Sequence, residues 1–154
     1  MDVKGHIRNR IEEAAACYVK DFEAIAETDL ARSPGGTARS PFDFTYEVVV
    51  VNKRIAARLR RETPPALQRE GWMTAPEEFK SKQGALQAFS ASVNEVLAAW
   101  DHVSPSHVDD AIETPSGHTT ALEMASLCAS HLTYHDAQLN YFQSLHGDSE
   151  MHWF

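Results

Sequence analysis

The chain has 154 residues, of which 43% are hydrophobic and 23% charged, an ordinary globular composition that predicts one domain over residues 1–154. Its formal net charge of −8, without a marked basic cluster, argues against nucleic acid as the main partner. No apolar run approaches the ~20 residues of a membrane span, and two cysteines are too few for a disulfide framework, so we expect no membrane partner and a reduced, cytoplasmic location.

The first predicted helix ends at a firm break. Apolar residues recur at steps of three and four from Val3 to Ile25, the spacing typical of one helical face. The segment Ser-Pro-Gly-Gly at 33–36 then stops the pattern, because proline and glycine interrupt helices.

The second predicted helix has a complete start signal. Ser40 suits the N-cap, Pro41 the first helical position, and Asp43 the capping-box position. Four valines at 48–51 continue its apolar stripe, and two prolines at 64–65 end it. The valine run is also compatible with a buried strand, but we see no second strand candidate to pair with it and interpret it as helix.

The third and fourth predicted helices also begin at capping boxes. Thr74 and Glu77 predict the start of the third helix, which ends before a polar, proline-containing connection. The fourth begins at Thr119 or Thr120, with Glu123 placed to complete a box, and ends near His146.

Four long amphipathic segments without a credible strand predict an all-α fold, a four-helix bundle. The expected connections of about ten residues or more are longer than a minimal up-down bundle needs. Such connections often cover a site at one end of a bundle.

The fourth predicted helix carries the most informative pair of residues. His131 and His135 are four residues apart, which places both imidazoles on one helical face, one turn apart. The same face carries apolar residues, among which an imidazole needs a partner for its nitrogens. A divalent metal is one such partner, and hydrogen-bonded core or surface histidines are the alternative.

Two histidines need a further ligand to hold a catalytic metal, and Glu47 is the best candidate. It precedes the four valines and lies at the edge of their stripe, where burying a carboxylate without a cation is costly. Alternatively, Glu47 turns outward into solvent or pairs with Lys53 or Arg54.

Cys128 is the rival third ligand, since it lies three residues before His131 on the same face. Three ligands from one straight helix rarely converge on one ion, and packing is the default role of a small buried cysteine. We also expect Asn52, Asp136 and Gln138 to act as supporting or pocket groups.

The pattern on the last helix resembles that of the DinB-like (DinB/YfiT) superfamily. His131 and His135, followed by Gln138 and a leucine, match its H-x-x-x-H-x-x-Q-L motif. Members of the superfamily are four-helix bundles that bind a divalent metal, commonly nickel or zinc, between the second and fourth helices. The resemblance places Glu47 where the superfamily normally has a histidine, and Asn52 where it often has a polar residue.

The resemblance implies a metal site of two histidines and one carboxylate, which suits nickel or zinc and, as alternatives, iron or manganese. Characterised relatives include isomerases and transferases that use low-molecular-weight thiols. The chain is therefore expected to be a metal-dependent enzyme of this thiol-dependent type, acting on a small-molecule substrate. The alternatives are a non-catalytic metal-binding protein and a structural bundle with a degenerate site. We expect the chain to form a homodimer.

Overall fold

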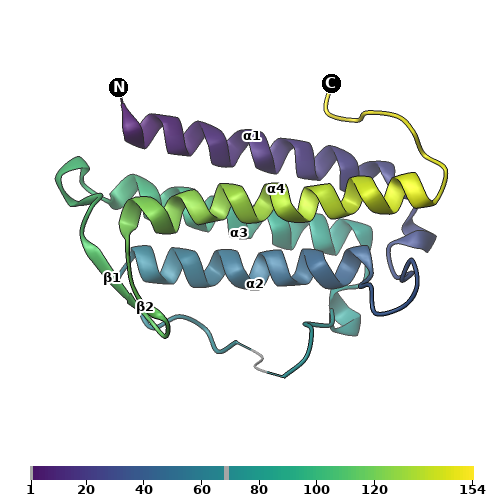
Figure 1. Ribbon diagram of the computed structural model, residues 1–154, viewed down its shortest axis with the longest axis horizontal. Coiled ribbons are helices and arrows are strands. Elements are labelled where there is room, and N and C mark those ends of the chain that lie inside the picture. The colour runs from purple at the N-terminus through teal and green to yellow at the C-terminus, as the bar shows by residue number, and fades with distance from the viewer. Residues whose placement is uncertain (1, 68–69) are drawn as a thin grey trace.

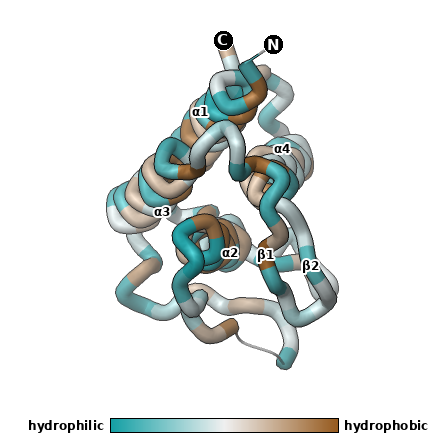
Figure 2. Tube along the Cα trace, turned by 90° about the vertical axis from the view of Figure 1, so that its left-hand side faces the viewer, coloured by the Kyte–Doolittle hydropathy of each residue, from teal (hydrophilic) through white to brown (hydrophobic). Residues whose placement is uncertain are grey.

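The computed structural model describes residues 2–67 and 70–154 and confirms the all-α bundle. Its four long helices are α1 (Val3–Ala24), α2 (Pro41–Leu59), α3 (Lys82–His102) and α4 (Ala121–Leu145). Seen end-on they occupy four corners, with α1 and α2 each packed against both α3 and α4 (Figure 2). None of the described helices is long and apolar enough to cross a membrane.

The long connection after α2 changes the direction of the chain. It runs back along the bundle before α3 begins, so that α2 and α3 point the same way (Figure 1). α4 runs antiparallel to α2 and lies directly beside it. The crossover thus returns the chain to the end of the bundle where α2 begins.

The helix starts show which of the predicted capping signals operate. Ser40 and Asp43 form the capping box of α2, and Thr120 and Glu123 form that of α4, as predicted. The valine run at 48–51 is helical, which confirms the helix interpretation over the strand alternative.

The predicted start of the third helix at Thr74–Glu77 is wrong. Only a short 3₁₀ turn, Glu77–Phe79, follows it, and α3 begins at Lys82 with Ser81 as its N-cap. The carboxylate of Asp43 accepts a hydrogen bond from the Ala75 backbone N–H at 2.8 Å, which ties this segment to the start of α2 instead of to α3.

The expectation of no strands also needs correction. The connection before α4 contains a two-stranded antiparallel hairpin, β1 (Ala111–Thr114) and β2 (Gly117–Thr120). Its strands have four residues each and bury little beyond Ile112, so the sequence carries no long alternating pattern that would have announced them. Gly117, with φ of 126°, allows the tight turn.

The core between the helices is aromatic and aliphatic, with a few buried polar links. Trp100, Tyr18, Phe22 and Phe89 are its largest fully buried side chains. The Tyr18 hydroxyl is hydrogen-bonded to the Thr45 side chain at 2.7 Å, which ties α1 to α2 across the bundle. This packing fixes the facing surfaces of α2 and α4, where the predicted ligands lie.

Candidate metal centre

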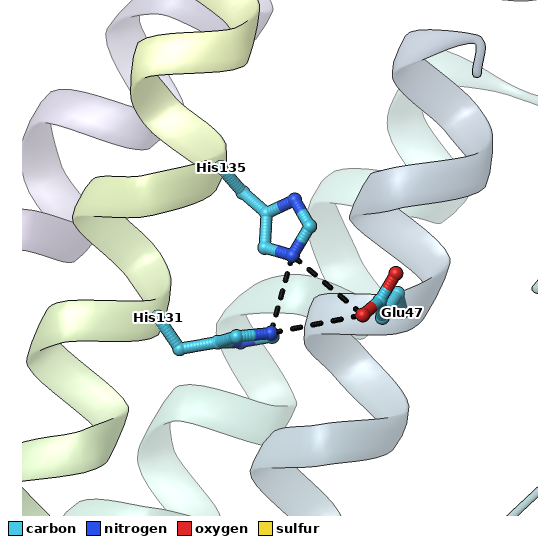
Figure 3. A group of neighbouring side chains, drawn as sticks. All are labelled: Glu47, His131 and His135. Carbon is cyan, nitrogen blue, oxygen red and sulfur yellow. Dashed lines mark hydrogen bonds and ion pairs between the residues drawn. The ribbon is translucent and has the colours of Figure 1, made fainter. Parts of the chain in front are cut away.

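Three potential ligands converge between α2 and α4. Glu47 projects from α2 toward His131 and His135, which lie one turn apart on α4 (Figure 3). The Nε2 atoms of the two histidines are 3.1 Å apart, and each lies 3.9 Å from Oε1 of Glu47. The structure thus brings together the three side chains that the sequence singled out.

The spacing of these donor atoms fits a divalent ion. Metal–nitrogen bonds of about 2.0–2.1 Å in tetrahedral geometry place neighbouring ligand atoms about 3.3 Å apart. The histidine pair matches that spacing, and the carboxylate oxygen would close by roughly 0.6 Å. Two imidazoles and one carboxylate leave coordination positions open, as in catalytic sites and unlike closed structural ones.

The position of His135 is fixed by its neighbours. Its side chain is fully buried, and Nδ1 donates a hydrogen bond to Oε1 of Gln138 at 2.8 Å, which turns the Nε2 lone pair toward His131 and Glu47. The rings of Phe44 and Tyr134 pack against it at centroid distances of 5.9 and 5.0 Å. Burial, and secondarily the neighbouring His131, lower the pKa of His135 to about 4, so it is neutral at pH 7.

His131 is less firmly supported. Its side chain is 16% exposed, and its buried Nδ1 has no hydrogen-bond partner among the described protein atoms. Of the two histidines, His135 therefore has the ordered support that usually accompanies a metal ligand.

Glu47 is ionised and paired with a cation that the sequence analysis did not identify. Arg39, in the connection before α2, donates a hydrogen bond to Oε2 of Glu47, and the two side chains are only 12% and 20% exposed. His131 and Arg39 both favour the charged form and lower the pKa of Glu47 to about 2. The distance of 3.9 Å between Nε2 of His131 and Oε1 of Glu47 exceeds hydrogen-bond length, so Glu47 is held more firmly by Arg39 than by His131.

The pairing of Glu47 with Lys53 or Arg54 that we weighed from sequence is not what forms. Those two residues follow Glu47 along α2, and Arg54 instead donates to the backbone of Pro65. Arg39 precedes the N-cap and shares no helical register with Glu47, so periodicity gave no signal for it.

Cys128 lies outside this group of donors. It is fully buried, its Sγ contacts Oδ1 of Asn52 at 3.5 Å, and Asn52 in turn donates to Ser92 of α3 at 3.1 Å. Burial raises the pKa of the Cys128 thiol to about 12, so it stays protonated. Asn52 is thus part of a buried polar link between helices and not the pocket group that we expected.

Asp136 also differs from its predicted supporting role, because it faces α1. Burial and a hydrogen bond to Asp21 raise its pKa to about 8. Asp21, fully buried, accepts further hydrogen bonds from the side chains of Asn140 and Trp153. The hydrogen bond from Asn140 to Asp21 ties α4 to α1, and of the three expected supporting residues only Gln138 is hydrogen-bonded to a candidate ligand.

A cavity of about 240 Å³ lies next to the partners of two donors, although none of the three donors itself lines it. Arg39, which binds Glu47, and Gln138, which binds His135, are both part of its wall. Much of the remaining wall is aromatic, with Phe44, Trp72, Tyr134 and Phe142 among its residues. Trp72 comes from the crossover after α2 and stacks on the Arg39 guanidinium at 4.6 Å. No motif or spacing in the sequence marks Arg39 or Trp72 as a site residue.

Known proteins resemble this chain in fold and in sequence. A crystal structure of a conserved protein from Enterococcus faecalis superposes with a TM-score of 0.75 at 15% identity, covering 94% of this chain and 97% of the other. No curated protein is significantly similar to the chain in sequence. The sequence model of the DinB superfamily matches residues 10–139, which include all three candidate ligands. The chain belongs to the DinB superfamily.

Proposed function

We propose that Glu47, His131 and His135 bind one divalent metal ion, and that the protein is a metal-dependent enzyme acting on a small molecule. The observation that carries this proposal is the convergence of three donor atoms, all within 4.8 Å of one another, beside a cavity. An ionised carboxylate and a buried imidazole that is neutral at pH 7 are already in the protonation states that metal binding requires.

The donor set favours nickel or zinc, with iron or manganese as alternatives. Imidazole nitrogen suits zinc, nickel and iron, and a carboxylate extends the range to manganese. The ordered hydrogen bond from His135 to Gln138 supports a site that holds its ion in one geometry.

The reaction that we propose is thiol transfer or isomerisation with a low-molecular-weight thiol. When bound, the ion would supply a Lewis acid that lowers the pKa of that thiol. The chain's own cysteines are poorly suited to this role, since burial raises the pKa of Cys128 to about 12 and that of Cys17 above its usual value. The nucleophile would therefore come from a cofactor, and a reduced, cytoplasmic location is expected for such chemistry.

One observation favours a non-catalytic alternative. Arg39 already neutralises Glu47, so the carboxylate is satisfied without a metal, as it would be in a structural bundle with a degenerate site.

For a homodimer, the outer face of α4 offers Leu127, Tyr134, Tyr141 and Leu145, all about half exposed or more and spaced by seven and four residues. Sedimentation of the wild type and of Leu127→Glu tests whether this face joins two copies.

Elemental analysis of protein purified gently and without a histidine tag tests the metal proposal. We expect about one transition-metal ion per chain, or stoichiometric uptake on titration. Protein that contains none and takes up none overturns it. Turnover of a panel of electrophiles with low-molecular-weight thiols, measured on metal-loaded and chelator-treated protein, then separates an enzyme from a binding protein.

A further inference from the structure

The cavity beside the candidate metal centre has a distinctive chemical character. Its wall combines one guanidinium, from Arg39, with the carboxamide of Gln138 and several aromatic rings. None of the described residues that line it carries a carboxylate, and Glu47 reaches the wall only through its hydrogen bond with Arg39. A hollow with one cation and apolar walls favours a ligand that is partly apolar and partly anionic.

Arg39 is equipped to hold an anion in this cavity. A guanidinium has five N–H donors, and Glu47 is the one hydrogen-bond partner that the described chain gives this side chain. Trp72 covers its face at 4.6 Å, and the Arg39 side chain is only 12% exposed, so most of the guanidinium is shielded from water. A shielded guanidinium binds a carboxylate in a fork of two hydrogen bonds, more strongly than an exposed one does.

Binding of a metal would change the charge next to the cavity. Without an ion, the positive charge of Arg39 and the negative charge of Glu47 cancel. With a divalent ion bound and both imidazoles neutral, the ion and the four side chains together carry a net charge of +2, so that an anion is attracted to the loaded site.

The size and walls of the cavity indicate what else the anion carries. An apolar cavity of about 150 Å³ holds benzene, so about 240 Å³ has room for a ring and one substituent. Trp72 and Tyr134 present aromatic surfaces against which such a ring stacks.

We propose that this cavity binds a small ring-bearing carboxylate, its carboxylate on Arg39 and its ring between the aromatic side chains, as the substrate of the metal-dependent reaction. The identity of the ligand as a substrate rests on the proposed function, whereas its binding by Arg39 does not. The carboxylate of the bound molecule would thus be one residue away from the metal, since Arg39 lines the cavity and is hydrogen-bonded to the candidate metal ligand Glu47.

Calorimetric titration with benzoate tests the proposal, with acetate and benzyl alcohol as probes that lack the ring or the charge. The proteins are metal-free wild type, metal-free Glu47→Gln, and the double variant Glu47→Gln/Arg39→Gln, all at about pH 8, where histidines are neutral. Glu47→Gln removes the negative charge that neutralises Arg39, and without any metal present benzoate cannot be held by an ion.

We expect Glu47→Gln to bind benzoate about tenfold or more tighter than metal-free wild type, and the double variant to lose that gain. Trp72→Leu in the Glu47→Gln background should weaken benzoate about threefold or more, whereas the matched change Trp153→Leu, at a tryptophan away from the cavity wall, should not. Circular dichroism confirms that each variant is folded.

Benzoate that binds no better than acetate or benzyl alcohol, or that binds equally with and without Arg39, overturns the proposal. The outcome is separable from the metal proposal, because metal uptake by the wild type is measured without benzoate and benzoate binding is measured without metal. A wild type without metal beside a Glu47→Gln variant that binds benzoate refutes only the proposed metal function. A wild type that takes up metal beside variants that all ignore benzoate refutes only the ligand class.

Discussion

Replacing Glu47 by glutamine distinguishes a metal ligand from a residue that serves only as the partner of Arg39. The change keeps the volume of the side chain and one acceptor oxygen, and it removes the charge. Supporting partners of metal ligands account for about 10- to 100-fold in affinity, so the loss of one of three ligands should weaken zinc or nickel binding by at least about 100-fold.

The same substitution has a second consequence, which does not involve metal. Arg39 is 12% exposed and would lose the one anionic partner that the described residues give it. Removing one member of a largely buried ion pair leaves the other charge uncompensated. Because both side chains keep some contact with water, we expect the metal-free variant to lose roughly 1–3 kcal/mol of unfolding free energy.

Titration against a competing chromophoric chelator gives the affinity, and denaturant unfolding of chelator-treated protein gives the stability. Glu47→His should restore tight binding, since it supplies a third imidazole. Arg39→Gln is the matched control, because it breaks the same ion pair and leaves the ligand set intact. It should lose similar stability but only about 10- to 100-fold in affinity. If Glu47→Gln loses stability yet binds zinc as tightly as the wild type, Glu47 is a structural partner and the three-ligand site is refuted.

Three further changes probe the surroundings of the site. Asp136→Asn should flatten the pH dependence of unfolding, because the pKa of Asp136 is about 8 in the folded chain and 3.8 in the unfolded chain. The stability that this carboxyl group contributes is complete below about pH 3.8 and is lost as pH rises toward 8. Urea unfolding at several pH values measures this loss, and a wild type that loses no stability over this range would contradict the prediction. Chelator-treated wild type should lose stability as pH falls from 6.5 toward 4, because the unfolded chain then binds a proton that the buried His135 imidazole does not. His135→Gln should abolish this loss, and a variant with the same acid profile as the wild type would contradict the prediction. Cys128→Ser should leave zinc affinity within about twofold in the chelator competition, and a large loss would reinstate the thiolate as the third ligand.

The four helices, and the helical face on which each candidate ligand lies, could be predicted from sequence because both follow local rules. The capping boxes at Ser40 and Thr120 rely on contacts within four residues, and the spacing of His131 and His135 fixes their common face whatever surrounds them. The same reasoning predicted the orientation of Glu47, because its position directly before the four valines on α2 places it at the edge of their buried face. That these side chains bind a metal is still a prediction.

The errors arose where a contact between distant segments decided the outcome. Thr74 had the sequence of a helix cap, but Asp43, thirty-two residues away in the chain, tied the Ala75 backbone to another helix, and Ser81 took over the cap. Asp136 had the spacing of a ligand support, but its side chain turned to α1, where burial and the neighbouring Asp21 raise its pKa. Periodicity identifies the face of a helix and not which neighbour covers that face.

The candidate metal ligands and the residues of the cavity wall come from different kinds of segment. The donors lie on helices, where packing of the core holds α2 and α4 at a fixed separation, and such a frame suits an ion that tolerates little change in distance. Arg39 and Trp72 come from the two connections on either side of α2, which the crossover brings to the same end of the bundle. Connections vary more readily than helices, so two proteins with this frame and the same three ligands can differ in the molecule that they admit. In this chain the cation next to Glu47, the candidate carboxylate ligand, is supplied by a connection, and exchanging Arg39 and Trp72 should therefore alter the preference for a bound molecule while leaving the bundle intact.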